Sequence, residues 1–253
     1  MSQRLSKKIF HICMIMVIII AIIFTALMFI LRYDENGEEN MPFCITKISI
    51  ISTVDGKDVE NSSNKWELNV IQNNDIYIYI EKNEEYKKQE TIKSVTLDNF
   101  QITETPKIGE LNIYKPVQNA NSIFENLSEN IAKEIKYTGD LESNIQNMKI
   151  SNQGGIIAFR VANDNIGKYI SNEDEEINYN KLLSKMNIKE EEIKAKISFD
   201  LKLELDSRIT FKATLVQDIP IEEIVEKGRT TKEIVELKNV VFKRLENKGL
   251  EIS

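Results

Sequence analysis

The stretch Ile193–Val216, IKAKISFDLKLELDSRITFKATLV, decides the fold class of this 253-residue chain. Apolar side chains stand at every odd position from Ile193 to Leu205, and polar side chains fill the even positions between them. Such alternation puts the apolar side chains on one face of a β-strand and the polar ones on the other. A second apolar set at odd positions, Ile209 to Leu215, predicts a partner strand.

The length of the loop between these two strands follows from the same pattern. A two-residue loop would place apolar side chains opposite polar ones, because a one-residue slip moves a whole set to the other face. A three-residue loop, Asp206–Arg208, pairs Leu205 with Ile209 and Phe199 with Leu215. We therefore predict a hairpin with an odd-numbered loop.

Shorter runs of the same kind occur on both sides of this hairpin and favour an all-β, sandwich-like fold. Strands are predicted over 45–54, 66–70, 76–80, 93–103, 111–114, 156–162, 168–171, 234–237 and 240–245. The pattern slips at Asn99-Phe100, which predicts a β-bulge. Turns are predicted at 55–58 (DGKD), 73–75 (NND) and 163–165 (NDN).

Helical signals are few. Ser122 and Glu125 match a capping box, and apolar residues follow at helical spacing, so a helix is predicted over 122–136. It would connect two β-rich halves, 43–118 and 145–253, or lie within one continuous region. Minor helices are predicted over 179–186 and after Pro220, ending at Gly228.

The N-terminal part carries a different signal. Ile9–Leu31 is a run of 23 residues without a charged, amide, glycine or proline residue, which is long enough for a helix to cross a bilayer. A cleaved signal peptide usually has a shorter apolar region and a small-residue cleavage site, so we predict an uncleaved anchor. Basic residues precede the run and acidic residues follow it, which indicates a cytoplasmic N-terminus. The expected organisation is 1–8 cytoplasmic segment, 9–31 transmembrane helix, 32–42 juxtamembrane linker and 43–253 extracytoplasmic β-rich region.

Charge and cysteine content restrict the partners of the exported part. After residue 31 the chain holds 30 basic and 40 acidic residues, a net charge of −10, which argues against binding to nucleic acid. Cys13 lies in the apolar run and Cys44 is alone outside it, so no disulfide forms within the exported part. Cys44, next to Phe43, is expected to be buried. The few cysteines and the abundance of Ile, Lys and Asn suggest a low-GC, Gram-positive-type bacterium, so the exported part is expected in a bacterial cell envelope.

No motif in the chain predicts catalytic, cofactor-binding or metal-binding residues. The single histidine, His11, belongs to the apolar run, so no histidine is available for triad catalysis or for a zinc site outside it. The acidic run 172–176 is interpreted as a solvated loop. Tyr77 and Tyr79 share one face of a strand; the pattern fits a stacking platform, but favours a central strand covered on both faces.

These observations predict a single-pass membrane protein whose β-region is a non-catalytic binding or scaffolding module. Its partner would be another envelope protein, bound through a sheet face or edge; no small-molecule ligand is inferred. Two alternatives remain: an envelope hydrolase that uses paired carboxylates, and a sensor coupled to a membrane partner.

Overall fold

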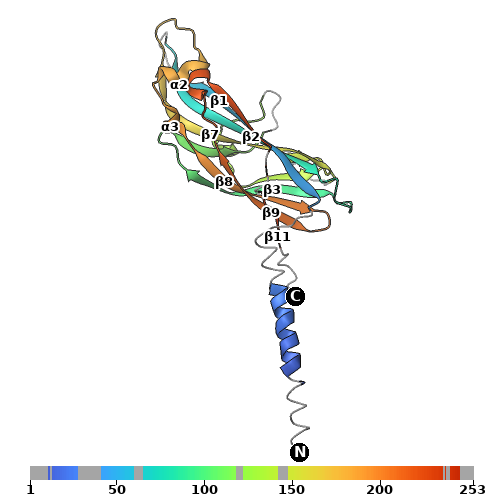
Figure 1. Ribbon diagram of the computed structural model, residues 1–253. Helices are drawn as coiled ribbons and strands as arrows, with labels where there is room; N and C mark the ends of the chain where they lie inside the picture. Colours follow the sequence, from blue (N-terminus) through green and yellow to red (C-terminus); the bar gives the residue numbers. More distant parts are fainter. Residues whose placement is uncertain are drawn as a thin grey trace, which may run out of the picture.

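The computed structural model describes residues 11, 13–27, 41–59, 65–117, 122–141, 148–235, 237 and 240–245. Its fold is all-β, with two sheets packed face to face and a few short helices (Figure 1). Sheet A has the strand order β10-β1-β2-β7-β4, and sheet B has the order β11-β9-β8-β3-β5-β6. Each sheet takes strands from both the 43–118 and the 145–253 portions of the chain. The strand bounds are β1 Phe43–Asp58, β2 Glu67–Lys82, β3 Ile92–Glu104, β4 Glu110–Tyr114, β5 Ile135–Gly139, β6 Met148–Ile150, β7 Gly154–Ile170, β8 Lys196–Leu205, β9 Thr210–Asp218, β10 Arg229–Ile234 and β11 Lys243–Leu245.

The hairpin β8–β9 has the predicted register. Phe199 pairs with Leu215 and Leu203 with Phe211, and the amide of Leu205 donates to the carbonyl of Ile209. The odd-numbered apolar side chains of β8 are at most 1% exposed, so they form the centre of the core. Arg208, the last loop residue, has φ +65°, the left-handed conformation that closes a three-residue loop.

Strands β1, β2 and β7 are about three times as long as an average strand, because three predicted turns are not formed. The segments 55–58, 73–75 and 163–165 all continue a strand. Asn73, Asn74 and Asn163 are buried, and their side chains find partners within the protein instead of in a turn. The Asn74 amide, for example, donates to the Val161 carbonyl (2.8 Å) and accepts from the buried Ser52 hydroxyl (2.6 Å).

These long strands carry two hydrophobic clusters. The larger cluster lies between the sheets and includes Phe159 of β7 and Phe199 of β8. The smaller cluster covers the far end of sheet A, where Leu68 and Val70 pack against short helices. Those helices are η2 Tyr179–Lys181, α2 Leu182–Lys185, α3 Glu190–Ile193 and α4 Ile224–Lys227. The minor helices predicted over 179–186 and before Gly228 are confirmed.

The helix predicted over 122–136 is not formed. The Ser122 hydroxyl bonds to the backbone of Phe124, two residues away, and a single 3₁₀ turn follows, η1 Ser128–Asn130. Phe124 is 3% exposed because it packs onto the outer face of sheet A, where the Arg160 guanidinium lies 4.9 Å from its ring centre. Contacts with the sheet therefore outweigh the weak local preference for a helix.

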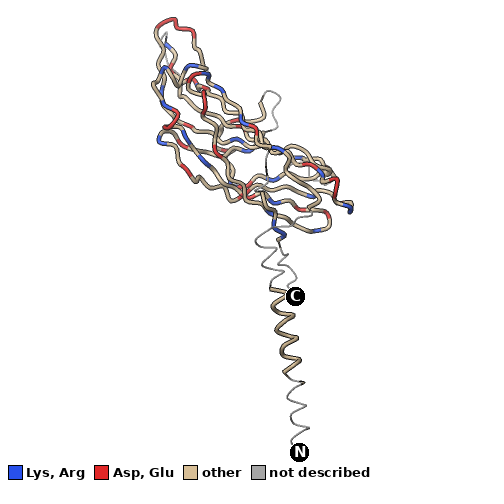
Figure 2. The backbone as a smooth tube through the Cα atoms, in the orientation of Figure 1, with Lys and Arg blue, Asp and Glu red and all other residues tan. Residues whose placement is uncertain are grey.

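Residues 13–27 are helical and expose their large apolar side chains, from 49% for Met14 to 64% for Val17. Residues 13–27 include no Lys, Arg, Asp or Glu, whereas basic and acidic residues are interspersed along the strands (Figure 2). Among the described residues, no helix combines the length and the apolar character that a membrane span requires. The predicted segment 1–8 and most of the linker 32–42 lie outside the described residues.

Candidate functional site

The site begins with the predicted bulge in β3, which is confirmed. The register of β3 against β8 shifts between Asp98 and Gln101, and Asn99 adopts φ +51°. Asparagine tolerates this conformation, and the Asn99 amide donates to the Asp200 carboxylate at 3.1 Å. The bulge turns Phe100 inward, where its ring centre lies 5.3 Å from that of Phe159.

The bulge is also the point where β3 loses a neighbour. β5 pairs with β3 only over residues 94–97, whereas β8 continues to Glu104. Beyond the bulge β3 is thus paired on one side only, within the part of the chain that the structure describes. The chain then turns at Gly109 (φ +82°) and enters sheet A as β4.

β4 is an edge strand of sheet A and is partly covered. The amide of Ala132 donates to the Ile113 carbonyl (2.9 Å), and the amide of Lys115 donates to the Asn130 carbonyl (3.0 Å). Residues 130–132 therefore protect the C-terminal end of β4. The opposite end, near Leu111, has no such neighbour among the described residues.

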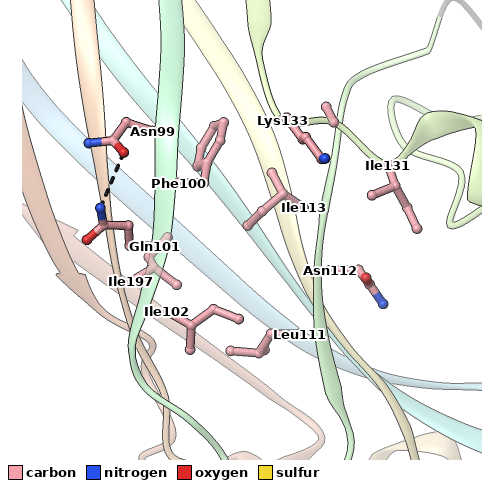
Figure 3. Close-up of a pocket in the computed structure, with 11 residues that line it drawn as sticks. Asn99, Phe100, Gln101, Ile102, Leu111, Asn112, Ile113, Ile131, Lys133 and Ile197 are labelled. Carbon is pink, nitrogen blue, oxygen red and sulfur yellow. Dashed lines mark hydrogen bonds between the residues drawn. The ribbon is translucent and has the colours of Figure 1, made fainter.

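Between β3 and β4 lies a groove of about 510 Å³ (Figure 3). Its lining is mainly apolar: Phe100, Ile102, Leu111, Ile113, Ile131, Ala132 and Ile197, with Asn99, Gln101, Asn112 and Lys133 as polar members. Ile102 is 44% exposed and Ile131 is 45% exposed, so both present apolar surface to solvent. An open apolar groove with a few polar groups is typical of a binding site.

Lys133 is the only charged side chain among the described residues that line this groove. The side-chain amides of Asn99, Gln101 and Asn112 supply further donors and acceptors, and Gln101 already donates to Asn99 at 3.3 Å. The groove thus combines apolar walls with one positive charge. Sequence reasoning missed Ile131 and Lys133 because it placed them in a helix; the slip at Asn99-Phe100 was the signal that marked the groove.

The outer face of sheet B carries paired charges instead of an apolar surface. Asp98 and Asp200 are direct neighbours on β3 and β8, and each contacts a lysine, Lys202 and Lys212 respectively. Burial raises the pKa of Asp200, but hydrogen bonds from Lys212, Thr214 and Asn99 outweigh burial and leave that pKa below its usual value. A glycosidase general acid needs a raised pKa, so Asp200 does not fit that role in the hydrolase alternative.

The tyrosine pair of β2 and the acidic run 172–176 both make contacts within the protein. Tyr77 and Tyr79 lie on the central strand β2, as expected, and both are partly buried, so their face is covered in part. The Lys47 ammonium lies 4.3 Å from the Tyr79 ring centre and so covers part of that ring. In the acidic run 172–176, Glu175 accepts hydrogen bonds from Lys185 of α2 and from the Tyr169 hydroxyl of β7. It therefore connects this loop to both elements.

Cys44 is exposed and not buried, because it alternates with the buried Phe43 and Ile45 on β1. Partial burial, followed by the nearby Glu81 charge, raises the pKa of its thiol. A raised pKa lowers the thiolate fraction, which is the opposite of what a nucleophilic cysteine requires.

No group of three or more metal-ligating side chains occurs among the described residues. No protein-family model, curated protein or solved structure matches the chain. The site is therefore interpreted from its geometry.

Proposed function

We propose that this protein is a membrane-anchored, non-catalytic binding module of a bacterial cell envelope, and that the groove between β3 and β4 is its contact site. The observation that carries the proposal is the pair of exposed isoleucines, Ile102 and Ile131, in a groove of about 510 Å³ beside incompletely paired strands. Apolar surface of this kind is stabilised when a partner removes it from water.

The anchor in this proposal is Ile9–Leu31, with the N-terminus in the cytoplasm and the β-region outside. Residues 13–27 support it, because they form a helix that is apolar on every side and exposes those side chains. A helix with no polar face needs an apolar environment, which a bilayer provides. The excess of positive charge before the run sets the orientation.

Site-specific photo-crosslinking in native membranes tests the contact site. A benzophenone amino acid replaces Ile102 in one form of the full chain and Ile170 in another; Ile170 is 63% exposed and lies outside the groove. We expect a discrete crosslinked product from position 102 and little from position 170. Adding Ile131→Ser to the first form should reduce that product. Equal products from both positions, or none from position 102, would contradict the proposed contact site.

A further inference from the structure

The edge of β4 offers unpaired main-chain groups next to the groove. In an antiparallel strand the N–H and C=O of one residue point to the same side, and alternate residues share that side. The Ile113 carbonyl and the Lys115 amide point toward residues 130–132, so the N–H and C=O of Leu111 point to the same edge. Within the described chain no backbone group reaches Leu111 from there.

Elsewhere the fold protects a comparable edge. β4 covers β7 only from Arg160 to Asp164, and just before this segment the Tyr137 hydroxyl bonds to both backbone groups of Ala158. The Tyr137 hydroxyl thus provides the hydrogen bonds that the β7 backbone lacks beyond the end of β4. Leu111 has no equivalent partner among the described residues, although Ile102 and Ile131 add exposed apolar surface to the groove.

We propose that an extended segment of a second protein adds to sheet A as a strand beside β4. Its backbone pairs with Leu111 and with the Ile113 amide, and its alternate apolar side chains enter the groove. An acidic side chain of the segment pairs with Lys133, the one charged residue among the described residues of the lining. This inference rests on the proposed function and specifies the partner: an extended, alternately apolar peptide with a carboxylate.

The chemistry favours a peptide over an acyl chain. Same-face side chains of a strand are spaced about 7 Å apart, so a few aliphatic side chains fit along the groove. A fatty acid could fill the apolar part and reach Lys133, but it would leave the backbone groups of Leu111 unpaired. Strand addition satisfies these groups while the side chains provide specificity.

An array of seven-residue peptides tests this with the full chain in detergent micelles. The peptides carry Val, Ile or Leu at alternate positions and Asp at one intervening position; matched sets replace Asp with Lys or methylate the edge-facing amides. We expect the Asp set to bind, the Lys set to bind about five-fold more weakly, and the methylated set to lose binding. Equal binding by methylated peptides would exclude strand addition.

Substitutions in the groove test whether the peptides bind there. Lys133→Glu should reverse the preference between the Asp and Lys sets, and Ile102→Ser should weaken binding to both. The exposed Lys87→Glu and Ile170→Ser serve as matched controls and should leave binding unchanged. Displacement of bound peptide by dodecanoate is not expected at concentrations below micelle formation. If dodecanoate binds the groove and no peptide does, the inference fails.

The two proposals can fail separately. If no peptide binds while the crosslink from position 102 persists in membranes, the groove is a contact site but strand addition is wrong. If that crosslink is also absent, the proposed function is wrong as well.

Discussion

The hydroxyl of Tyr137 donates a hydrogen bond to the carbonyl of Ala158 (2.7 Å) and accepts one from the amide of the same residue (2.9 Å). Tyr137 belongs to β5 of sheet B and Ala158 to β7 of sheet A, so one side chain joins the two sheets. It also closes the edge of β7 beyond the end of β4. Burial raises the pKa of Tyr137 to about 12, in keeping with a neutral hydroxyl that both donates and accepts.

Replacing Tyr137 by phenylalanine should therefore be costly. Tyr137→Phe leaves the backbone N–H and C=O of Ala158 buried without a partner, which lowers the free energy of unfolding by about 2 kcal/mol. Urea denaturation of the full chain in micelles measures this. Tyr77→Phe, on the partly buried outer face of β2, should change this free energy by less than about 0.5 kcal/mol. Equal effects of the two substitutions would show that Tyr137 stabilises only through its ring.

Arg160 holds the segment 122–130 on the outer face of sheet A. Its guanidinium donates to both carboxylate oxygens of Asp75 (2.6 and 3.0 Å) and to the side-chain oxygen of Asn126 (3.0 Å). Lysine cannot reproduce this forked geometry, so Arg160→Lys should release the segment. We expect hydrogen exchange at 122–130 to become at least about ten-fold faster, while β1 is unchanged. Unchanged exchange in the segment would mean that the packing of Phe124 and the hydrogen bonds of Asn126 with Asn73 and Lys57 hold it without Arg160.

The stabilising contribution of the Glu175 carboxylate should decrease at low pH. Hydrogen bonds from the Lys185 ammonium, then from the Asn172 amide and the Tyr169 hydroxyl, lower the pKa of Glu175 from the usual 4.5 to about 2. A group whose pKa is lower in the folded state stabilises above its unfolded pKa and loses that contribution as pH falls through the folded pKa. The difference in Tm between wild type and Glu175→Gln should therefore be constant at neutral pH and disappear between about pH 4.5 and 2. A difference that persists at pH 2 would contradict the role of the carboxylate charge.

Cys44 provides a natural probe of topology. Because Cys44 is exposed, an impermeant maleimide should label the chain in intact cells if the β-region lies outside, as proposed. Its raised pKa slows the reaction at neutral pH, so labelling should accelerate as pH rises. Cys44→Ser should abolish labelling and Cys13→Ser should not. Labelling that requires cell lysis would contradict the proposed location.

The alternation of apolar and polar residues correctly predicted the strands that bury one face and expose the other. The alternation over Ile193–Val216 predicted both the strands and their register, because burying one face permits one alignment only. It failed at 73–75 and 163–165, where asparagine and aspartate are typical of turns. Asn74 bonds across strands to the Val161 carbonyl, and Asn163 bonds to the Ile108 carbonyl in the turn before β4. Local sequence carries no signal of these partners.

The groove was only partly predictable. The slip at Asn99-Phe100 predicted the bulge, and the strand at 111–114 was predicted as well. Their proximity depends on β3 and β4 belonging to different sheets, which no short stretch determines. The remaining wall was missed because Leu127 and Ile131 follow helical spacing, although both are exposed and Phe124 is buried. Spacing indicates which side chains share a helix face only if a helix forms.

Hydrogen exchange of the full chain in native membranes is the most direct test of the groove as contact site. In the purified chain the Leu111 amide should exchange fast, because the described structure gives it no backbone partner at the edge. In native membranes, with the partner present, we expect exchange at Leu111 and Ile113 to slow by at least about ten-fold. No slowing there, together with protection at another exposed site such as Trp66 and Ile170, would contradict it.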